Sequence, residues 1–248
     1  MSVGVSEYQI AGQIHNACLD YLNNNVTTNW QTPRDTYASS ITEKIYTWSN
    51  NNNISFTSAD SAFNVNVIKS AMSDNLYGDA EATFAFILNS INDTIFAKDK
   101  DYIIELKEVF DDAKELSGEE KYLFAQNKLQ DIITEYNEDN WGENQGELAG
   151  GMLYIAQSSV NYWYSQISNP NFPPIYVNPP SQTMVAPVIA GLIAAGLTVA
   201  QIDSAGYLYG WWKSYNSGEK NPKKRIKAGL STAIDFSAAA TAWFMVFS

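Results

Sequence analysis

Apolar side chains recur every three or four residues through the first half of the chain, which is the spacing of one buried helix face. The pattern starts with Ile10, Ile14, Cys18 and Leu22. The alternation typical of β-strands is weak. The sequence therefore predicts six amphipathic helices with short polar breaks, near residues 10–22, 35–48, 58–72, 79–96, 101–116 and 117–136.

The sixth of these helices carries a start signal, because Ser117 is followed three residues later by Glu120 in the pattern of a capping box. Residues 137–150 then form a polar, acidic connection. The apolar and aromatic stretch 152–167 predicts a seventh helix. Five prolines within 168–181 predict an extended strap of polyproline character.

The C-terminal part of the chain is apolar over an unusual length. From Leu148 to Ile202, fifty-five residues contain no Lys, Arg, Asp or Glu, whereas about a quarter of the residues of a soluble domain are charged. This predicts burial, either in the protein's own core or in a bilayer. Two long segments, 184–215 and 222–247, flank a polar turn of the kind that joins antiparallel helices.

The expected fold is all-α: a multi-helix bundle of amphipathic helices with a long C-terminal antiparallel hydrophobic helical hairpin. The second arm has a clean start, with Asn221 as N-cap and Pro222 at the first helical position. We expect an acidic helical region over 1–147, the aromatic helix and strap over 148–181, and the hairpin over 182–248. These three parts are expected to form one folding unit.

Small residues follow a three–four rhythm on both arms of the hairpin, as in a glycine zipper, and such faces let helices approach closely. An antiparallel hairpin places Asp203 and Asp235 at nearly the same height, where two like charges raise a pKa. Three arrangements stay open: bonds to the front half, a shared proton or cation, or different neighbours. The predicted membrane or helix-packing face consists of Gly196, Asp203, Gly206, Gly210, Asp235 and Ala238.

A membrane role for the hairpin has arguments on both sides. Each arm reaches the length of about 20 residues that spans a bilayer, and a basic tip between the arms suits anionic headgroups. A mid-helix Asp costs about 2.5–3.5 kcal/mol on insertion scales, and the mean hydropathy is −0.25. The segment 184–247 resembles the buried hairpins of helical pore-forming toxins and colicin-type domains, which implies release on acidification. The basic tip comprises Lys220, Lys223, Lys224, Arg225 and Lys227.

Charge and rare residues exclude several classes of function. The net charge of −12 is concentrated in residues 1–147, which carry 24 acidic and 9 basic side chains, so nucleic acid is not an expected partner. Cys18 and His15 are the single cysteine and histidine, which excludes an intrachain disulfide and Cys-based or multi-His metal sites. Both lie on one side of a helix, as a nucleophile and base would, although a packed pair is the commoner arrangement. No cofactor or metal is predicted.

The opening segment carries a motif. Tyr8, Gly12, His15, Asn16, Leu19, Asp20 and Tyr21 fit a Tyr-x-x-x-Gly-x-x-His-Asn-x-x-Leu-Asp-Tyr pattern. Over these fifteen or so residues the chain resembles a group of uncharacterised exported bacterial proteins. The resemblance and the composition imply a secreted or cell-envelope protein, although no leader precedes the motif. Gly12, His15, Asn16 and Asp20 share a helix side, and we interpret them first as structural and second as a ligand site.

No catalytic signature is present, since nucleophile-elbow, P-loop, dinucleotide and zinc-protease patterns are all missing. The leading hypothesis is a non-enzymatic helical protein whose buried hairpin engages membranes or partner helices, with pore formation as one form of it. The alternative is an exported soluble binding module of unknown ligand. A hydrolase that uses a carboxylate pair, which the spacing does not identify, comes third.

Overall fold

The computed structural model describes residues 5–25, 34–54, 76–91, 94–142, 145–167 and 185–242. Within these residues every regular element is a helix, so the expected all-α fold is confirmed. The predicted helix at 58–72, the proline strap and residues 243–248 lie outside the described ranges. The helices are α1 Val5–Asn25, α2 Arg34–Asn51, α4 Leu76–Ser90, α5 Ala97–Lys114, α6 Glu120–Glu138, α7 Glu147–Ile167, α8 Val185–Asn216 and α9 Pro222–Ala242.

Most of the predicted helix starts differ by a few residues from those in the structure, and α1, α4 and α5 begin five, three and four residues earlier than predicted. The expected capping box is wrong, because α6 begins at Glu120 and its N-cap Glu119 makes no side-chain capping bond. Helix α7 begins at Glu147, five residues earlier than predicted. The start of α9 is as expected, since the backbone N–H of Lys223 donates to Asn221 Oδ1 over 3.0 Å.

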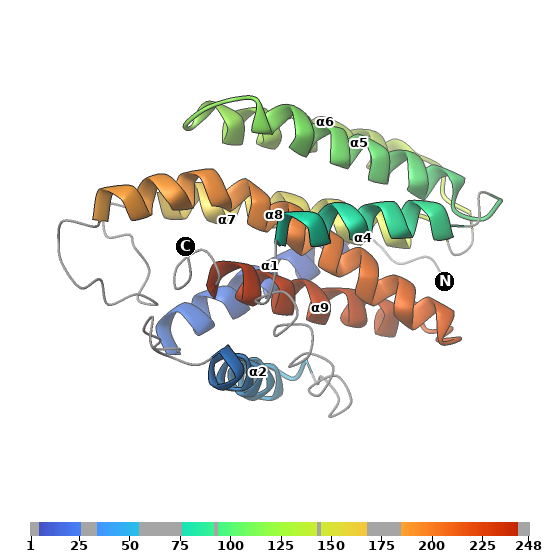
Figure 1. The fold of residues 1–248 in the computed structure, drawn as a ribbon. Helices are drawn as coiled ribbons and strands as arrows, with labels where there is room; N and C mark the ends of the chain where they lie inside the picture. Colours follow the sequence, from blue (N-terminus) through green and yellow to red (C-terminus); the bar gives the residue numbers. More distant parts are fainter. Residues whose placement is uncertain are drawn as a thin grey trace.

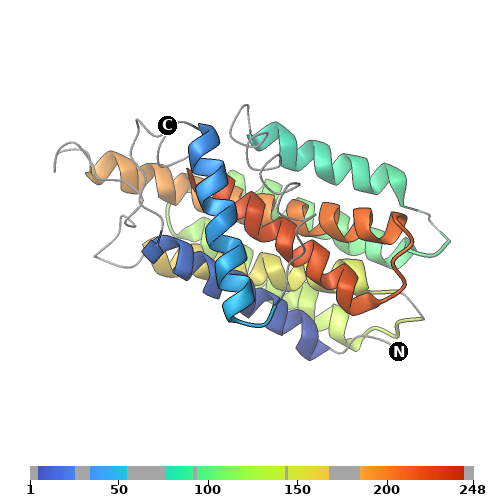
Figure 2. The ribbon, with the colours of Figure 1, turned by 90° about the horizontal axis from the view of Figure 1, so that it is seen from below.

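The helices stack in layers, with α7 and α8 at the centre (Figure 1). Helix α8 packs against α9, α7 and α4, while α7 also packs against α1, α6 and α5. The pair α5 and α6 forms an outer layer on one side of α7, and α1 and α9 lie on the other side. Helix α2 crosses outside α1 and α9 (Figure 2).

The charge-free stretch covers nearly all of α7 and the first part of α8, the two central helices. Residues 148–156 of α7 are buried on every side of the helix, and so are residues 196–208 of α8. A helix that has neighbours all round must be apolar all round, and this explains the missing charges. Among the described helices, none has an apolar stretch long enough to cross a membrane.

Helices α8 and α9 run antiparallel in close contact, joined by a turn over 217–221. A Cβ at Gly206 would come within 2.9 Å of the Thr232 carbonyl oxygen. One turn further along, Gly210 faces the Ala228 carbonyl in the same register. Glycine at these positions removes the side chain that would hold the two backbones apart.

Candidate functional site

A polar cluster lies inside the bundle where α1, α7, α8 and α9 meet. His15 on α1 is fully buried, and its Nε2 lies 3.4 Å from Oδ2 of Asp203 on α8. The hydroxyl of Ser159 on α7 donates to the same Asp203 oxygen over 2.5 Å. Ser237 on α9 also faces this carboxyl. Four helices therefore contribute to one sealed group.

The approach of α1 to α7 depends on Gly12. A Cβ at this position would lie 2.8 Å from the Tyr154 carbonyl oxygen, so only glycine allows this spacing. One turn along, Asn16 Nδ2 donates to the Ser158 carbonyl over 2.9 Å. These two contacts set the depth and rotation at which His15 enters the core.

The hydrogen bonds of Asn16 also assign the tautomer of His15. The amide nitrogen of Asn16 is used by Ser158, so its Oδ1 faces His15 Nδ1 at 3.0 Å as an acceptor. Nδ1 must then carry the imidazole hydrogen. The unprotonated Nε2 faces Oδ2 of Asp203 at 3.4 Å and has no hydrogen-bond partner among the described residues.

Burial shifts both groups toward this neutral arrangement. It raises the pKa of Asp203 well above its usual range, and the hydroxyls of Ser159 and Ser237 oppose that shift without cancelling it. Burial lowers the pKa of His15 to about 4, against the opposing hydrogen bond to Asn16. Both shifts favour the uncharged forms of the two side chains.

Asp235 occupies the matching position on α9. The register that pairs Gly206 with Thr232 also brings Asp203 and Asp235 level across the seam. Asp235 is fully buried and lies beside Cys18 of α1, where its charge adds to burial in raising the pKa of the thiol. The two carboxyls thus have different partners on α1, and the thiol is far from the reactive thiolate form.

A second buried polar group lies at the start of α7. Arg225 of α9 donates from Nε to Oε2 of Glu147 at 3.0 Å and from Nη2 to Oε1 at 2.8 Å. Its guanidinium carbon lies 5.4 Å from the centre of the Trp211 ring, and Nη1 donates to the Glu219 carbonyl. The pair connects the start of α9 to the start of α7 through the interior.

Asp99 caps the N-terminus of α7. Its carboxylate accepts hydrogen bonds from the backbone N–H of Gly146 at 3.0 Å and of Ala149 at 2.9 Å. Burial raises its pKa to about 6, the two backbone donors oppose that shift, and nearby Glu147 adds to it. A buried carboxyl from α5 thus accepts hydrogen bonds from N–H groups at the start of α7 that have no partner within the helix.

The structure brings together residues from two predicted sets, the N-terminal polar cluster and the packing face of the hairpin. From the N-terminal set, Gly12, His15 and Asn16 face the interior, while Asp20 lies at the surface next to Tyr162. From the hairpin face, Asp203, Asp235, Gly206 and Gly210 lie at or beside the α8–α9 seam and Ala238 is buried. Gly196 instead abuts Trp163 of α7 and Tyr122 of α6.

The basic tip is divided by burial. Arg225 is 2% exposed and belongs to the interior pair, whereas Lys220, Lys223, Lys224 and Lys227 are exposed. Lys223 pairs with Glu7 at 2.7 Å, and Lys224 pairs with Glu219 at 3.3 Å. The exposed tip is therefore smaller than the sequence suggests, and part of it is neutralised.

The sequence did not single out Ser159, Glu147 or the capping role of Asp99. A usable signal existed for Glu147, because it is the last charge before the charge-free stretch and Asp203 is the first after it. Both of these flanking acids are buried. No comparable signal distinguishes Ser159 from its serine neighbour, since only the rotation of α7 decides which hydroxyl faces Asp203.

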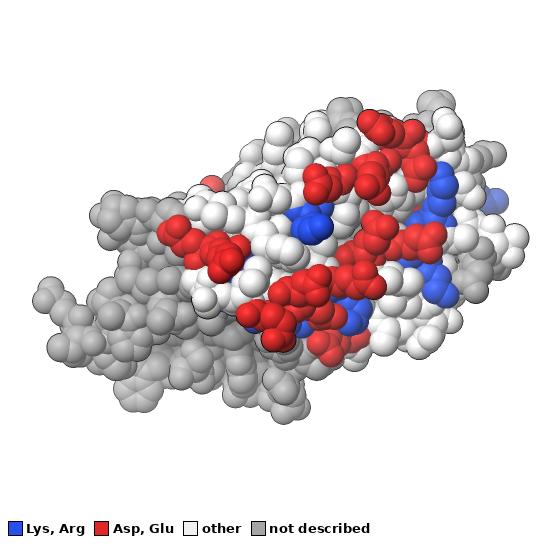
Figure 3. Space-filling view, turned by 90° about the horizontal axis from the view of Figure 1, so that it is seen from above, with Lys and Arg blue, Asp and Glu red and all other residues white. Residues whose placement is uncertain are grey.

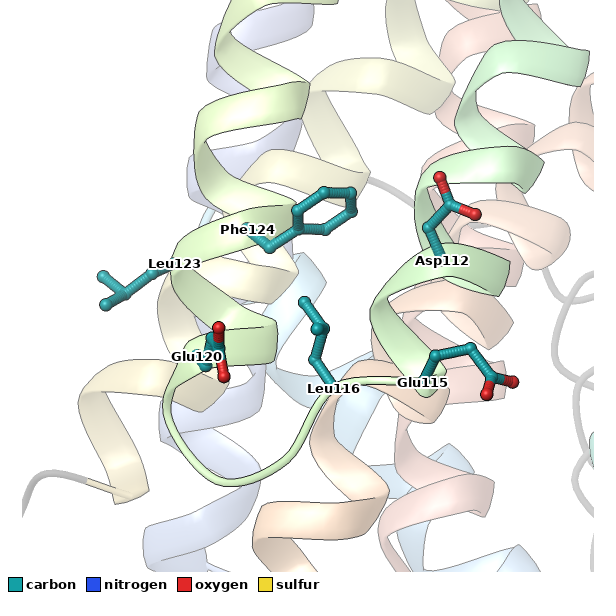
Figure 4. A pocket seen from close by; sticks show the side chains of 6 residues that line it. All are labelled: Asp112, Glu115, Leu116, Glu120, Leu123 and Phe124. Carbon is teal, nitrogen blue, oxygen red and sulfur yellow. The ribbon is translucent and has the colours of Figure 1, made fainter.

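The outer layer carries an open hollow of about 520 Å³ at the turn between α5 and α6. In Figure 4, Leu116 and the Phe124 ring point into the space between the helices, Asp112 and Glu115 extend from α5, and Glu120 lies on α6. No three His, Cys, Asp or Glu side chains of the described residues come together to hold a metal ion. The hollow is lined by Asp112, Glu115, Leu116, Glu120, Leu123 and Phe124.

Comparison with known proteins found no matching protein family, no matching curated protein and no matching solved structure. The resemblance of the opening segment to exported bacterial proteins therefore stays a prediction.

Proposed function

We propose that this chain is a non-enzymatic helical binding protein that engages a positively charged protein partner through its outer layer, α5 and α6. One observation carries the proposal. Residues 101–139 hold twelve acidic side chains and four lysines, a net of −8 out of −12 for the whole chain. This acidity lies on a two-helix layer whose neighbours among the described helices, α4, α7 and α8, lie on one side of it.

Most carboxylates of this layer are exposed. Figure 3 looks down on it and shows Asp and Glu side chains running in bands, with few Lys among them. Two of the four lysines are already engaged, since Lys107 and Lys114 both pair with Asp111. Such a field attracts a basic partner and accelerates the encounter at low salt.

The location of the reactive side chains supports a binding role over catalysis. His15, Cys18, Asp203 and Asp235 are fully buried within the bundle. A general base must reach the proton that it abstracts, directly or through one water. A substrate would meet these groups only if α1 separated from α8 and α9, so we assign them to the stability of the hairpin.

In this proposal the hairpin is the scaffold, and engagement of a membrane is the competing outcome. The test uses two synthetic amidated helical peptides of matched length, one of Lys, Ala and Leu and one with Glu in place of Lys. Calorimetry compares the affinities of the two peptides at about 50 mM and about 300 mM salt. The higher concentration shortens the electrostatic screening length and so weakens attraction between exposed charges. Flotation with vesicles of phosphatidylserine and phosphatidylcholine runs in parallel.

We expect micromolar binding of the Lys peptide at low salt, at least tenfold weaker binding at high salt, and no binding of the Glu peptide. We also expect the protein to stay unbound in the flotation assay. If the Lys peptide does not bind at low salt, or if the protein floats with vesicles at neutral pH, the proposed function is wrong.

A further inference from the structure

The hollow at the α5–α6 turn combines an apolar floor with three acids at its edges. Leu116 and Phe124 form the floor, and Leu123, which is 46% exposed, lies beside it on α6. Asp112 and Glu115 lie on the α5 side and Glu120 on the α6 side. An apolar recess with acids around it fits a ligand that is apolar at one point and positive around that point.

The three acids at the hollow are uncompensated. Within the residues that the structure describes, Asp112, Glu115 and Glu120 form no ion pair, and each is exposed. The nearest lysine along α5, Lys114, is engaged by Asp111 and by Glu81 of α4. Three like charges around one recess repel one another, and a bound cationic group relieves that repulsion.

The size and shape of the hollow limit what can occupy it. Its volume of about 520 Å³ lies within the range of small binding pockets. It is open to solvent and lies across the end of two helices, so the rest of the ligand must extend over the acidic layer. A segment of a folded or folding protein meets this requirement.

We propose that this hollow is the anchor point for a basic amphipathic segment of a protein partner, which inserts one apolar side chain over Leu116 and Phe124. Lys or Arg residues of the segment, spaced one helical turn from the anchor, pair with Asp112, Glu115 and Glu120. This inference rests on the proposed function, because it assigns to one site the basic partner that the whole acidic layer attracts.

Matched variants separate the site from the general charge of the layer. The triple variant Asp112→Asn, Glu115→Gln, Glu120→Gln removes three charges at the hollow. Its control removes three exposed charges elsewhere on the same two helices, through Asp101→Asn, Asp131→Asn and Glu138→Gln. Both triples carry the same net charge, so a difference between them reports position alone.

A second pair of variants tests the apolar floor. Leu116→Asn acts at the hollow, and Ile104→Asn changes an exposed apolar residue on α5 outside it. Neither side chain belongs to the packed core, so both variants are expected to fold, which circular dichroism and thermal unfolding verify. The Lys peptide, with a single Leu as its apolar residue, is the probe for all four proteins and for the wild type.

We expect the hollow triple and Leu116→Asn each to weaken binding of the Lys peptide about tenfold, and both controls to change it less than about twofold. Carbodiimide coupling of the peptide followed by mass spectrometry should locate the cross-links at residues 112, 115 and 120. Equal losses in both triples, or cross-links spread evenly along α5 and α6, overturn the anchor site. In that result the wild type still binds, so the proposed function survives.

Discussion

His15 of α1 and Asp203 of α8 form a buried pair, with Nε2 and Oδ2 3.4 Å apart and both side chains fully enclosed. The pair joins the first helix of the chain to the first arm of the C-terminal hairpin. Burial favours the uncharged form of both side chains, which is the low-cost way to enclose them. The titration of this pair therefore affects the stability of the whole bundle.

The stability contributed by this pair should fall as the pH rises above about 6.5. In the unfolded chain Asp203 loses its proton near 3.9 and His15 near 6.5, whereas we expect folded Asp203 to keep its proton above 6.5 because burial raises its pKa. Above 6.5 the folded state thus binds one proton more than the unfolded state. The free energy of unfolding should drop by about 1.4 kcal/mol per pH unit until folded Asp203 ionises.

Asp203→Asn isolates this effect, because the amide is permanently neutral and can still donate to His15. Urea unfolding at several pH values should show that the variant lacks the wild-type decline above 6.5. Between about 4 and 6.5 the variant should instead gain stability with pH, since the pKa of His15 is about 4 in the fold and near 6.5 when unfolded. Parallel curves for the two proteins would show that Asp203 is already ionised in the folded protein.

Asp99 should produce a separate pH effect in a lower window. Its pKa of about 6 exceeds the unfolded value near 3.9. The folded state therefore keeps a proton that the unfolded state has lost, and stability should fall by about 3 kcal/mol as the pH rises from about 4 to 6. Asp99→Asn should flatten this part of the unfolding curve and leave the decline above 6.5 unchanged.

Much of the fold was predictable because the buried face of each helix leaves a periodic pattern of apolar residues in the sequence. The positions of α1, α2, α5 and the α8–α9 turn follow from that pattern. The pairing of His15 with Asp203 could not be predicted in this way. It depends on how closely α1 approaches α7, and the contact of Gly12 with the Tyr154 carbonyl sets that distance. Arg225 was assigned to an exposed tip for the same reason. A charged residue near a turn is normally exposed, and only the tertiary structure shows that Arg225 pairs with the buried Glu147.

The Glu147–Arg225 pair should be strongly coupled. Removing one partner leaves the other charge buried, which costs about 3–5 kcal/mol. Glu147→Gln and Arg225→Met should each destabilise the protein by that order, and the double variant should be less destabilised than the sum of the two. A double-mutant cycle from urea unfolding measures the coupling. A coupling energy near zero would mean that the pair adds nothing beyond packing.

Close packing of the hairpin should make Gly206 intolerant of any side chain. Alanine normally stabilises a helix by about 1 kcal/mol over glycine, but here its Cβ would lie 2.9 Å from the Thr232 carbonyl oxygen. We expect Gly206→Ala to cost about 2 kcal/mol net. Thermal unfolding should show a fall of several degrees. Asn127→Ala, at an exposed position on α6, should leave the midpoint unchanged or raise it.

Cys18 gives a direct measure of whether the hairpin leaves the core. This thiol on α1 is fully buried beside Asp235 of α9, and burial raises its pKa. A thiol reagent such as dithionitrobenzoate should therefore react orders of magnitude more slowly with the native protein than in urea, since only opened molecules expose the thiolate. Adding anionic vesicles at neutral pH should leave the native rate unchanged if the hairpin is a scaffold. A vesicle-dependent acceleration would show that α9 separates from α1 at a membrane, and would favour hairpin insertion over docking on the acidic layer.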